Sequence, residues 1–164
     1  LAENISAVQA GGVATNILTR GFWTSFVVVG GGGITLSLLI AIFIFSKRED
    51  HKSIAKFSLI PGICGINEPI IFGTPIVLNP ILSIPFLIMP CISSGLGYLV
   101  QKMGIVSLGY IVDPSFTPFF AQGFLSALDI RNVIFMFVLI AISVVVYYPF
   151  FKVYEKNTLE HEGE

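Results

Sequence analysis

Three long stretches of the chain contain no charged residue and consist mainly of apolar side chains. They cover residues 21–46, 79–100 and 132–151. A helix needs roughly 20 apolar residues to cross the hydrocarbon core of a bilayer. Each stretch meets that length, so the pattern predicts three transmembrane helices.

The apolar segment 57–78 is built differently, because polar residues and a proline interrupt it in the middle. Residues 57–66 would form a helix of only about 15 Å at about 1.5 Å per residue, half of a bilayer core about 30 Å thick. Asn67 or Glu68 can cap a returning helix, and Pro69 suits its first turn because the N–H group there has no helical partner. We therefore predict a re-entrant hairpin whose tip lies near the middle of the membrane.

A second uncharged segment, 114–128, is too short to cross the bilayer comfortably and contains Pro118 and Gly123. Proline lacks a backbone donor and breaks helices, and backbone groups freed in this way must be satisfied by protein or water rather than by lipid. This pattern favours a second re-entrant hairpin. The predicted fold class is an all-α integral membrane protein with about three transmembrane helices and two re-entrant hairpins.

The distribution of basic residues predicts how these elements are oriented. Segment 47–56 contains four lysine and arginine residues, and such segments are retained on the cytoplasmic side. If both hairpins return to the side from which they enter, residues 79–100 cross outward and residues 132–151 cross back. The charged tail 152–164 is then cytoplasmic, so we expect a multi-pass protein whose C-terminus lies in the cytoplasm.

Composition narrows the classes of function. Charged residues make up 12% of the chain and hydrophobic residues 54%, whereas soluble domains contain about 25% charged residues. A water-soluble enzyme and a disordered chain are therefore excluded, and a net charge of −1 provides no basic field for nucleic acid. Cys64 and Cys91 lie in apolar runs without the spacing of a zinc site, so we expect neither a metal ion nor a cofactor. Because the chain begins at Leu1 without a signal segment, we expect it to be a piece of a longer polypeptide.

Glu68 is the one charged residue between residues 57 and 101. A charge at the centre of a bilayer costs on the order of 3 kcal/mol on insertion scales, so its presence requires a reason. The functional interpretation is a polar site at a broken helix, as transporters use, with Asn67 able to donate and accept hydrogen bonds to a sugar. The structural alternative is a helix cap or an ion pair with a basic residue of a neighbouring element: Arg20, Lys102 or Arg131.

Other polar and aromatic features have structural interpretations. The run Gly30–Gly33 lacks the spacing of a dinucleotide or phosphate loop and predicts close helix packing or a backbone that faces substrate. His51 and His161 are expected to be solvated in charged segments. Four aromatic residues near span ends predict an interfacial belt: Phe22, Trp23, Tyr147 and Tyr148. Four more either stack on a sugar or pack in the core: Tyr110, Phe116, Phe119 and Phe120.

The sixteen residues 65–80, Gly-Ile-Asn-Glu-Pro-Ile-Ile-Phe-Gly-Thr-Pro-Ile-Val-Leu-Asn-Pro, resemble the signature of the membrane permease subunits (enzyme IIC) of the bacterial sugar phosphotransferase system. The similar family is that of lactose, cellobiose and diacetylchitobiose permeases. Residues 30–36 are similar to its Gly-Gly-Ser-Gly-Ala-Thr-Leu motif, and residues 147–152 resemble its final helix. The resemblance covers essentially the whole chain but only the C-terminal, substrate-binding part of the family's permease.

The resemblance implies a function in the bacterial inner membrane. A permease of this family binds a disaccharide, here of the cellobiose or diacetylchitobiose type, and moves it inward. A phosphorylated IIB subunit, supplied by IIA and HPr, then transfers its phosphoryl group from a phosphocysteine to the sugar. By the same resemblance Glu68 is the catalytic residue, which accepts a hydrogen bond from the sugar hydroxyl, worth roughly 1.5–3 kcal/mol, and acts as general base. The implied substrate-binding residues are Gly65, Ile66, Asn67, Glu68, Phe116 and Thr117.

Three departures from the family pattern qualify this expectation. Gly32 stands where the family has serine, and Ile34 where it has alanine. Residues 114–118, Pro-Ser-Phe-Thr-Pro, replace Pro-Trp-Thr-Thr-Pro, so the tryptophan stacking platform is either missing or moved to Phe116. The family's upstream substrate histidine and N-terminal helices have no counterpart here. The resemblance therefore implies a homodimer formed through the N-terminal part, and a fragment that is inactive alone as a component of a phosphotransferase.

Two other interpretations use the same residues. An ion-coupled secondary transporter would use Glu68 as a proton or ion site, and uptake would then collapse with an uncoupler. A non-transporting structural product would bind no sugar while the parent protein binds it.

Overall fold

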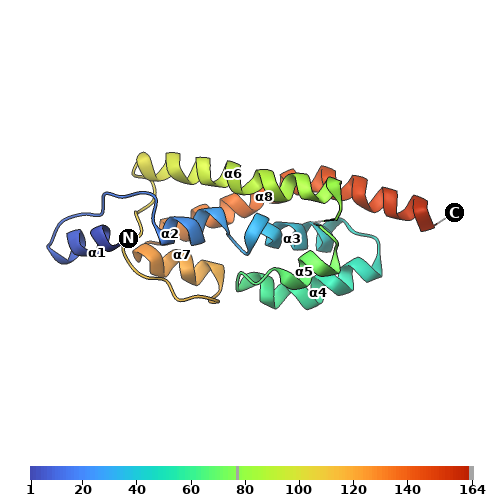
Figure 1. Cartoon of the computed structure of the whole chain (residues 1–164), viewed down its shortest axis with the longest axis horizontal. Coiled ribbons are helices and arrows are strands. Elements are labelled where there is room, and N and C mark those ends of the chain that lie inside the picture. Colours follow the sequence, from blue (N-terminus) through green and yellow to red (C-terminus); the bar gives the residue numbers. More distant parts are fainter. Residues whose placement is uncertain (77, 163–164) are drawn as a thin grey trace.

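A computed structural model of the chain describes residues 1–76 and 78–162, with side chains through Thr158 apart from residue 77. All regular structure in these ranges is helical. Residue 77 of the predicted hairpin, the side chain of His161 and the last two residues lie outside the described part. Three long helical units run along the long axis of the molecule (Figure 1).

The three long units contain segments long and apolar enough to cross a membrane: Arg20–Phe45, Pro80–Lys102 and Ile130–Thr158. The prediction of three such helices is therefore confirmed. The second segment is helix α6, Pro80–Lys102, which starts at a cap formed by the side chain of Asn79. The third lies in helix α8, Ile130–Glu162, which continues through the residues expected to form a separate polar tail.

The first span is a broken helix. Helix α2 (Arg20–Phe22) continues into a π-helical turn at Trp23–Val27, and helix α3 (Thr35–Phe45) follows a 3-10 turn at Gly32–Ile34. Gly33 lies between the two halves with a φ of +72°, and a Cβ atom there would overlap the ring of Phe86 on α6. This position needs glycine both for its left-handed backbone and for the close approach. The expectation of close packing at the glycine run is confirmed.

The first span is also the centre of the bundle. The buried share of its apolar 18-residue stretch is 72%, whereas the corresponding share is 28% in each of the other two spans. Leu38, Leu39 and Ile42 of α3 are fully buried, and Ser37 donates a hydrogen bond to the carbonyl of Ile140 on α8 at 3.3 Å. The outer faces of α6 and α8 instead expose large apolar side chains, which is the arrangement that lipid contact requires.

Helices α4 (Glu49–Ile63) and α5 (Glu68–Gly73) form a helical hairpin beside α3. Helix α4 begins within the charged segment 47–56. Glu49 and Asp50 occupy its first turn, where negative charge favours helix formation, and Lys52 pairs with Glu49 at 3.2 Å.

The expectation that His51 is solvated is wrong. Its side chain is buried, with 4% of the residue exposed, and its ring stacks on Tyr154 of α8 with centroids 5.5 Å apart. The reason is that the charged segment is helical, so one face of its first turns points at α8.

The segment 114–128 contains a single short helix, α7 (Phe119–Ala127), preceded by a non-helical arm. Gly123 lets α7 approach Met136 of α8 closely. Asp129 joins the two helices and accepts hydrogen bonds from Ser107 and from the Arg131 guanidinium at 2.9 Å. The hydrogen bond from Arg131 and then that from Ser107 lower the pKa of Asp129 to about 2.

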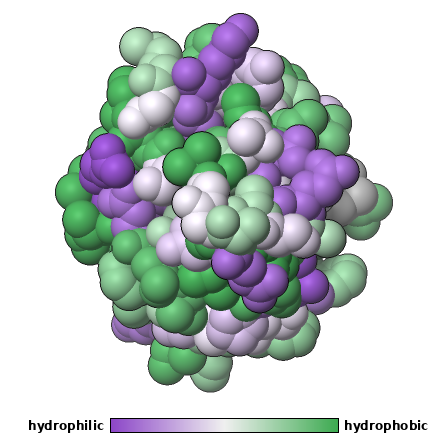
Figure 2. Space-filling model, turned by 90° about the vertical axis from the view of Figure 1, so that its left-hand side faces the viewer, coloured by the Kyte–Doolittle hydropathy of each residue, from purple (hydrophilic) through white to green (hydrophobic). Residues whose placement is uncertain are grey.

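The predicted aromatic belt is correct for only half of its members. Trp23 and Tyr148 are exposed, by 57% and 36%, whereas Phe22 and Tyr147 are buried. Adjacent residues of a helix point about 100° apart, so one residue of each neighbouring pair faces the bundle. Figure 2 shows that the end of the molecule near helix α1 (Ala2–Gln9) carries hydrophilic patches among apolar side chains, as expected where a bundle leaves the bilayer.

We expect the Gly33→Ala substitution to destabilise the intact membrane protein by about 2–5 kcal/mol. The left-handed backbone contributes roughly 1–2 kcal/mol and overlap with Phe86 roughly 1–3 kcal/mol. Thermal unfolding in detergent measures the change. Gly95→Ala on α6 is the matched control, because a Cβ atom there meets no neighbour. Equal melting temperatures for the two variants would contradict the role of Gly33.

Candidate functional site

The turn between α4 and α5 ends at Asn67, and the rest of the motif Asn67-Glu68-Pro69 begins α5. Helix α4 ends in a Schellman motif: the N–H of Gly65 donates to the carbonyl of Gly62 at 3.1 Å, and that of Ile66 donates to the carbonyl of Pro61 at 2.9 Å. Gly65 has a φ of +80° and open space around it. In Figure 1 this turn lies near the middle of the long axis of the molecule.

Asn67 connects the turn to the broken span. It occupies the N-cap position of α5, but its side chain makes no capping hydrogen bond. Its Nδ2 instead donates to the carbonyl of Gly32 at 3.0 Å. Of the two residues considered as caps of this helix, Asn67 therefore makes no side-chain capping bond, and its amide instead binds the backbone of the glycine break.

Tyr147 makes a hydrogen bond to Gly33, the residue that follows Gly32 in the break. Its hydroxyl donates to the carbonyl of Gly33 at 2.6 Å, and its side chain is fully buried. Two successive carbonyls of the first span thus receive donors from the hairpin and from α8. Its predicted place at the membrane interface is wrong. The position of Tyr147 inside a long apolar stretch was the available signal, since a buried tyrosine hydroxyl needs a partner.

Glu68 is the first residue of α5, and its side chain is exposed. It makes no hydrogen bond or ion pair with any described residue. The basic residues weighed as its partners are engaged elsewhere: Arg20 lies 3.9 Å from Asp113, Arg131 pairs with Asp129, and Lys102 lies over the ring of Tyr98. The ion-pair alternative is therefore not found within the described chain.

The structure does not join Phe116 and Thr117 to the α4–α5 turn. Phe116 is 72% exposed with a φ of +60°, and the hydroxyl of Thr117 donates to the carbonyl of Pro114 at 3.1 Å. The arm that carries them also ends near the middle of the long axis (Figure 1). Within the described side chains no hydrogen bond or ring contact links the two segments.

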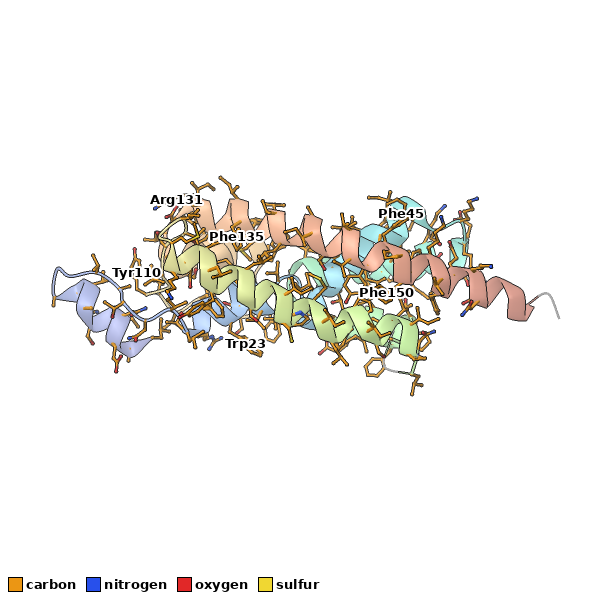
Figure 3. The ribbon with its side chains drawn as sticks, turned by 90° about the horizontal axis from the view of Figure 1, so that it is seen from above. Trp23, Phe45, Tyr110, Arg131, Phe135 and Phe150 are labelled. Atoms are coloured by element: carbon orange, nitrogen blue, oxygen red, sulfur yellow. The ribbon has the colours of Figure 1, made fainter. Side chains whose placement is uncertain are left out.

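Two of the remaining aromatic candidates, Phe119 and Tyr110, have other positions in the fold. Phe119 is buried against Phe137 of α8 with ring centroids 5.3 Å apart, so it belongs to the core. Tyr110 lies toward the end of the molecule that carries α1 (Figure 3). Among the residues that the structure describes, no group of three or more histidine, cysteine or acidic side chains is placed to hold a metal ion.

Residues 1–90 match the family model described as "Phosphotransferase system, EIIC". The matched segment contains the glycine break, Asn67 and Glu68. The chain belongs to this EIIC family.

Individual relatives and a solved structure agree with the assignment. The EIIC chain is 36% identical to the lichenan permease IIC component of Bacillus subtilis (strain 168) over 98% of its length. It is 38% identical to the PTS system cellobiose-specific EIIC component of Lactococcus lactis subsp. lactis (strain IL1403) over 88% of its length. It spans 36% and 29% of those two relatives.

The crystal structure of the transporter ChbC, the IIC component from the N,N'-diacetylchitobiose-specific phosphotransferase system, has the same fold. It superimposes with a TM-score of 0.92 at 34% identity, over 98% of this chain and 38% of that one. The helical arrangement described above is therefore that of a segment of a IIC membrane transporter.

We expect Tyr147→Phe to destabilise the intact EIIC protein by about 1–3 kcal/mol, because the Gly33 carbonyl loses its donor in a buried site. Tyr148→Phe is the matched control: this tyrosine is partly exposed, and the change should stay within about 0.5 kcal/mol. Thermal unfolding of both variants in detergent provides the comparison. Two equal, small shifts would show that the hydroxyl does not stabilise the break.

Proposed function

We propose that this chain forms the substrate-binding part of a disaccharide-specific IIC permease of the phosphotransferase system. The observation that carries the proposal is the exposed Glu68, which has no partner among the described residues and follows a hairpin turn that Asn67 fixes to a broken span. A carboxylate kept in an apolar segment is costly, and a sugar hydroxyl is a suitable partner for it. The chemical class of sugar follows from the relatives, whose names specify cellobiose and diacetylchitobiose.

In this proposal Glu68 accepts a hydrogen bond from the hydroxyl that becomes phosphorylated. The carboxylate takes the proton as the hydroxyl oxygen attacks phosphorus on the phosphorylated IIB subunit. The cysteine thiolate of IIB leaves, so the phosphoryl donor belongs to IIB, and IIA and HPr recharge it. The EIIC chain supplies transport, orientation and the base.

The neighbouring residues have distinct proposed roles. The Nδ2 atom of Asn67 donates a hydrogen bond to the Gly32 carbonyl. The Oδ1 atom of Asn67 remains as the acceptor for a second sugar hydroxyl. Gly65 and Ile66 offer backbone on an open side of the turn. Phe116 and Thr117 contact the sugar from the other arm, with the exposed ring of Phe116 as the stacking surface.

We further propose that the α4–α5 hairpin and segment 114–128 are re-entrant from opposite sides of the inner membrane. Six of the nine basic residues lie toward the end where α3 meets α4 and α8 finishes (Figure 1): Lys47, Arg48, Lys52, Lys56, Lys152 and Lys156. The positive-inside rule makes this the cytoplasmic end. A homodimer would form through family segments outside this chain.

The Glu68→Gln substitution tests the site in the intact permease. It should weaken disaccharide binding about 10- to 100-fold, since a hydrogen bond to a charged acceptor is worth about 1.5–3 kcal/mol, and lower phosphorylating uptake about 100-fold or more. Calorimetric titration with cellobiose and diacetylchitobiose measures binding. Glu49→Gln, an exposed glutamate at the start of α4, is the control and should leave both unchanged. Wild-type uptake in Glu68→Gln would refute the base role.

The proposed orientation makes a separate prediction for reporter fusions. A reporter that is active only in the cytoplasm should be active after Glu164 and inactive after Gly104, which follows α6. A full crossing by residues 57–78 alone would place the C-terminal reporter outside, and a further crossing by residues 114–128 would return it to the cytoplasm with the Gly104 reporter also active. An inactive C-terminal fusion, in a protein that inserts normally, would overturn the re-entrant arrangement.

A further inference from the structure

A basic groove lies between the end of α3 and the last part of α8, at the opposite end of the molecule from α1. Its volume is about 760 Å³, and its lining includes Phe45, Tyr148 and Val153 together with Lys47, Lys152 and Lys156. Figure 3 shows Phe45 beside this part of α8. The apolar residue Phe45 ends the first span. Lys47 lies two positions after it in the sequence, and Lys152 lies four positions after Tyr148.

The floor of the groove is apolar and aromatic. The rings of Phe45 and Tyr148 lie with centroids 4.4 Å apart, and Phe45 and Val153 are 40% and 50% exposed. The Lys152 ammonium lies 5.8 Å from the centre of the Tyr148 ring. An apolar floor that meets ammonium groups at one end matches a molecule with a hydrocarbon chain and a charged head.

The charge of the groove favours an anionic head. Three lysines line it and one acid, Glu155. The Oε1 atom of Glu155 is already engaged, since it accepts hydrogen bonds from the Ser46 hydroxyl at 2.6 Å and from the Lys47 N–H at 3.0 Å. The lysine ammonium groups therefore outnumber the carboxylate, and they lie where a span leaves the hydrocarbon.

We propose that this groove is a binding site for an anionic phospholipid of the leaflet at this end of the bundle. The phosphate lies between Lys47 and Lys152, and one acyl chain follows Phe45 and Tyr148 toward the middle of the bilayer. Basic pockets between transmembrane helices bind such headgroups, and each lysine near an anionic membrane contributes about 1 kcal/mol. The bound lipid links the first span to α8 without touching the α4–α5 turn.

The test uses the intact permease, purified in detergent and titrated with phosphatidylglycerol or phosphatidylcholine, with bound lipid counted by native mass spectrometry. Lys47→Gln combined with Lys152→Gln should weaken phosphatidylglycerol binding about tenfold or more and leave phosphatidylcholine binding unchanged. Lys102→Gln is the matched control. The Lys102 ammonium also lies near an aromatic ring, 6.0 Å from the centre of the Tyr98 ring, but this lysine ends α6 and does not line the groove. It should bind phosphatidylglycerol as the wild type does.

A second variant separates the groove from charge alone. Val153→Trp fills the groove from an exposed position and keeps every lysine, so it should also displace phosphatidylglycerol, while the melting temperature in lipid-free detergent stays unchanged. Equal binding of the two lipids by the wild type would overturn the proposal, as would equal losses in the Lys102→Gln control. Unchanged phosphatidylglycerol binding in Val153→Trp would also overturn it, because the lipid would then bind outside the groove.

Discussion

The structure depends on how the break in the first span is satisfied. Glycines 30–33 end one half-helix and start the next, which releases backbone carbonyls in the centre of an apolar bundle. Such groups need protein donors, because lipid supplies none. The amide of Asn67 and the hydroxyl of Tyr147 donate to two successive carbonyls. These donors come from the hairpin and from α8, so one local defect fixes the relative positions of three elements.

The hydrogen bond from Asn67 to the glycine break also explains why Asn67 and the adjacent Glu68 have different surroundings. Asn67 is turned to the glycine backbone and holds the hairpin tip, whereas Glu68 begins the next helix with its side chain exposed. A carboxylate held on a fixed turn is pre-organised for a ligand, since little conformational freedom is lost on binding. Tyr147 lies outside the signature motif but supports the same turn indirectly, through Gly33.

The outer parts of the molecule follow a simpler rule. The apolar outer faces of α6 and α8 suit lipid, and charged residues gather where the helices end. At one such end Asp129, Ser107 and Arg131 form a compact polar cluster that joins α6, α7 and α8. At the other end, lysines and aromatic rings border an open groove. The two ends therefore present different chemistry to the two membrane surfaces.

The sequence by itself determined the membrane class, the three long apolar helices and the family, because span length, charge gaps and the motif around Glu68 are local properties. It also indicated a helix interruption near Asn67, although the interruption lies at residues 64–67, and Glu68 and Pro69 already belong to α5. It did not reveal that the charged segment is helical or that His51 is buried, since the facing of a helix depends on its neighbours.

Only the tertiary structure decided where Asn67 and Tyr147 direct their donors. The acceptors are backbone carbonyls 35 and 114 positions away in the chain, and a backbone carbonyl has no sequence signature. Which residue of a pair such as Tyr147 and Tyr148 faces the bundle is likewise set by packing, because both have the same side chain. The sequence therefore specifies which groups need partners, and the packed helices determine which partners they find.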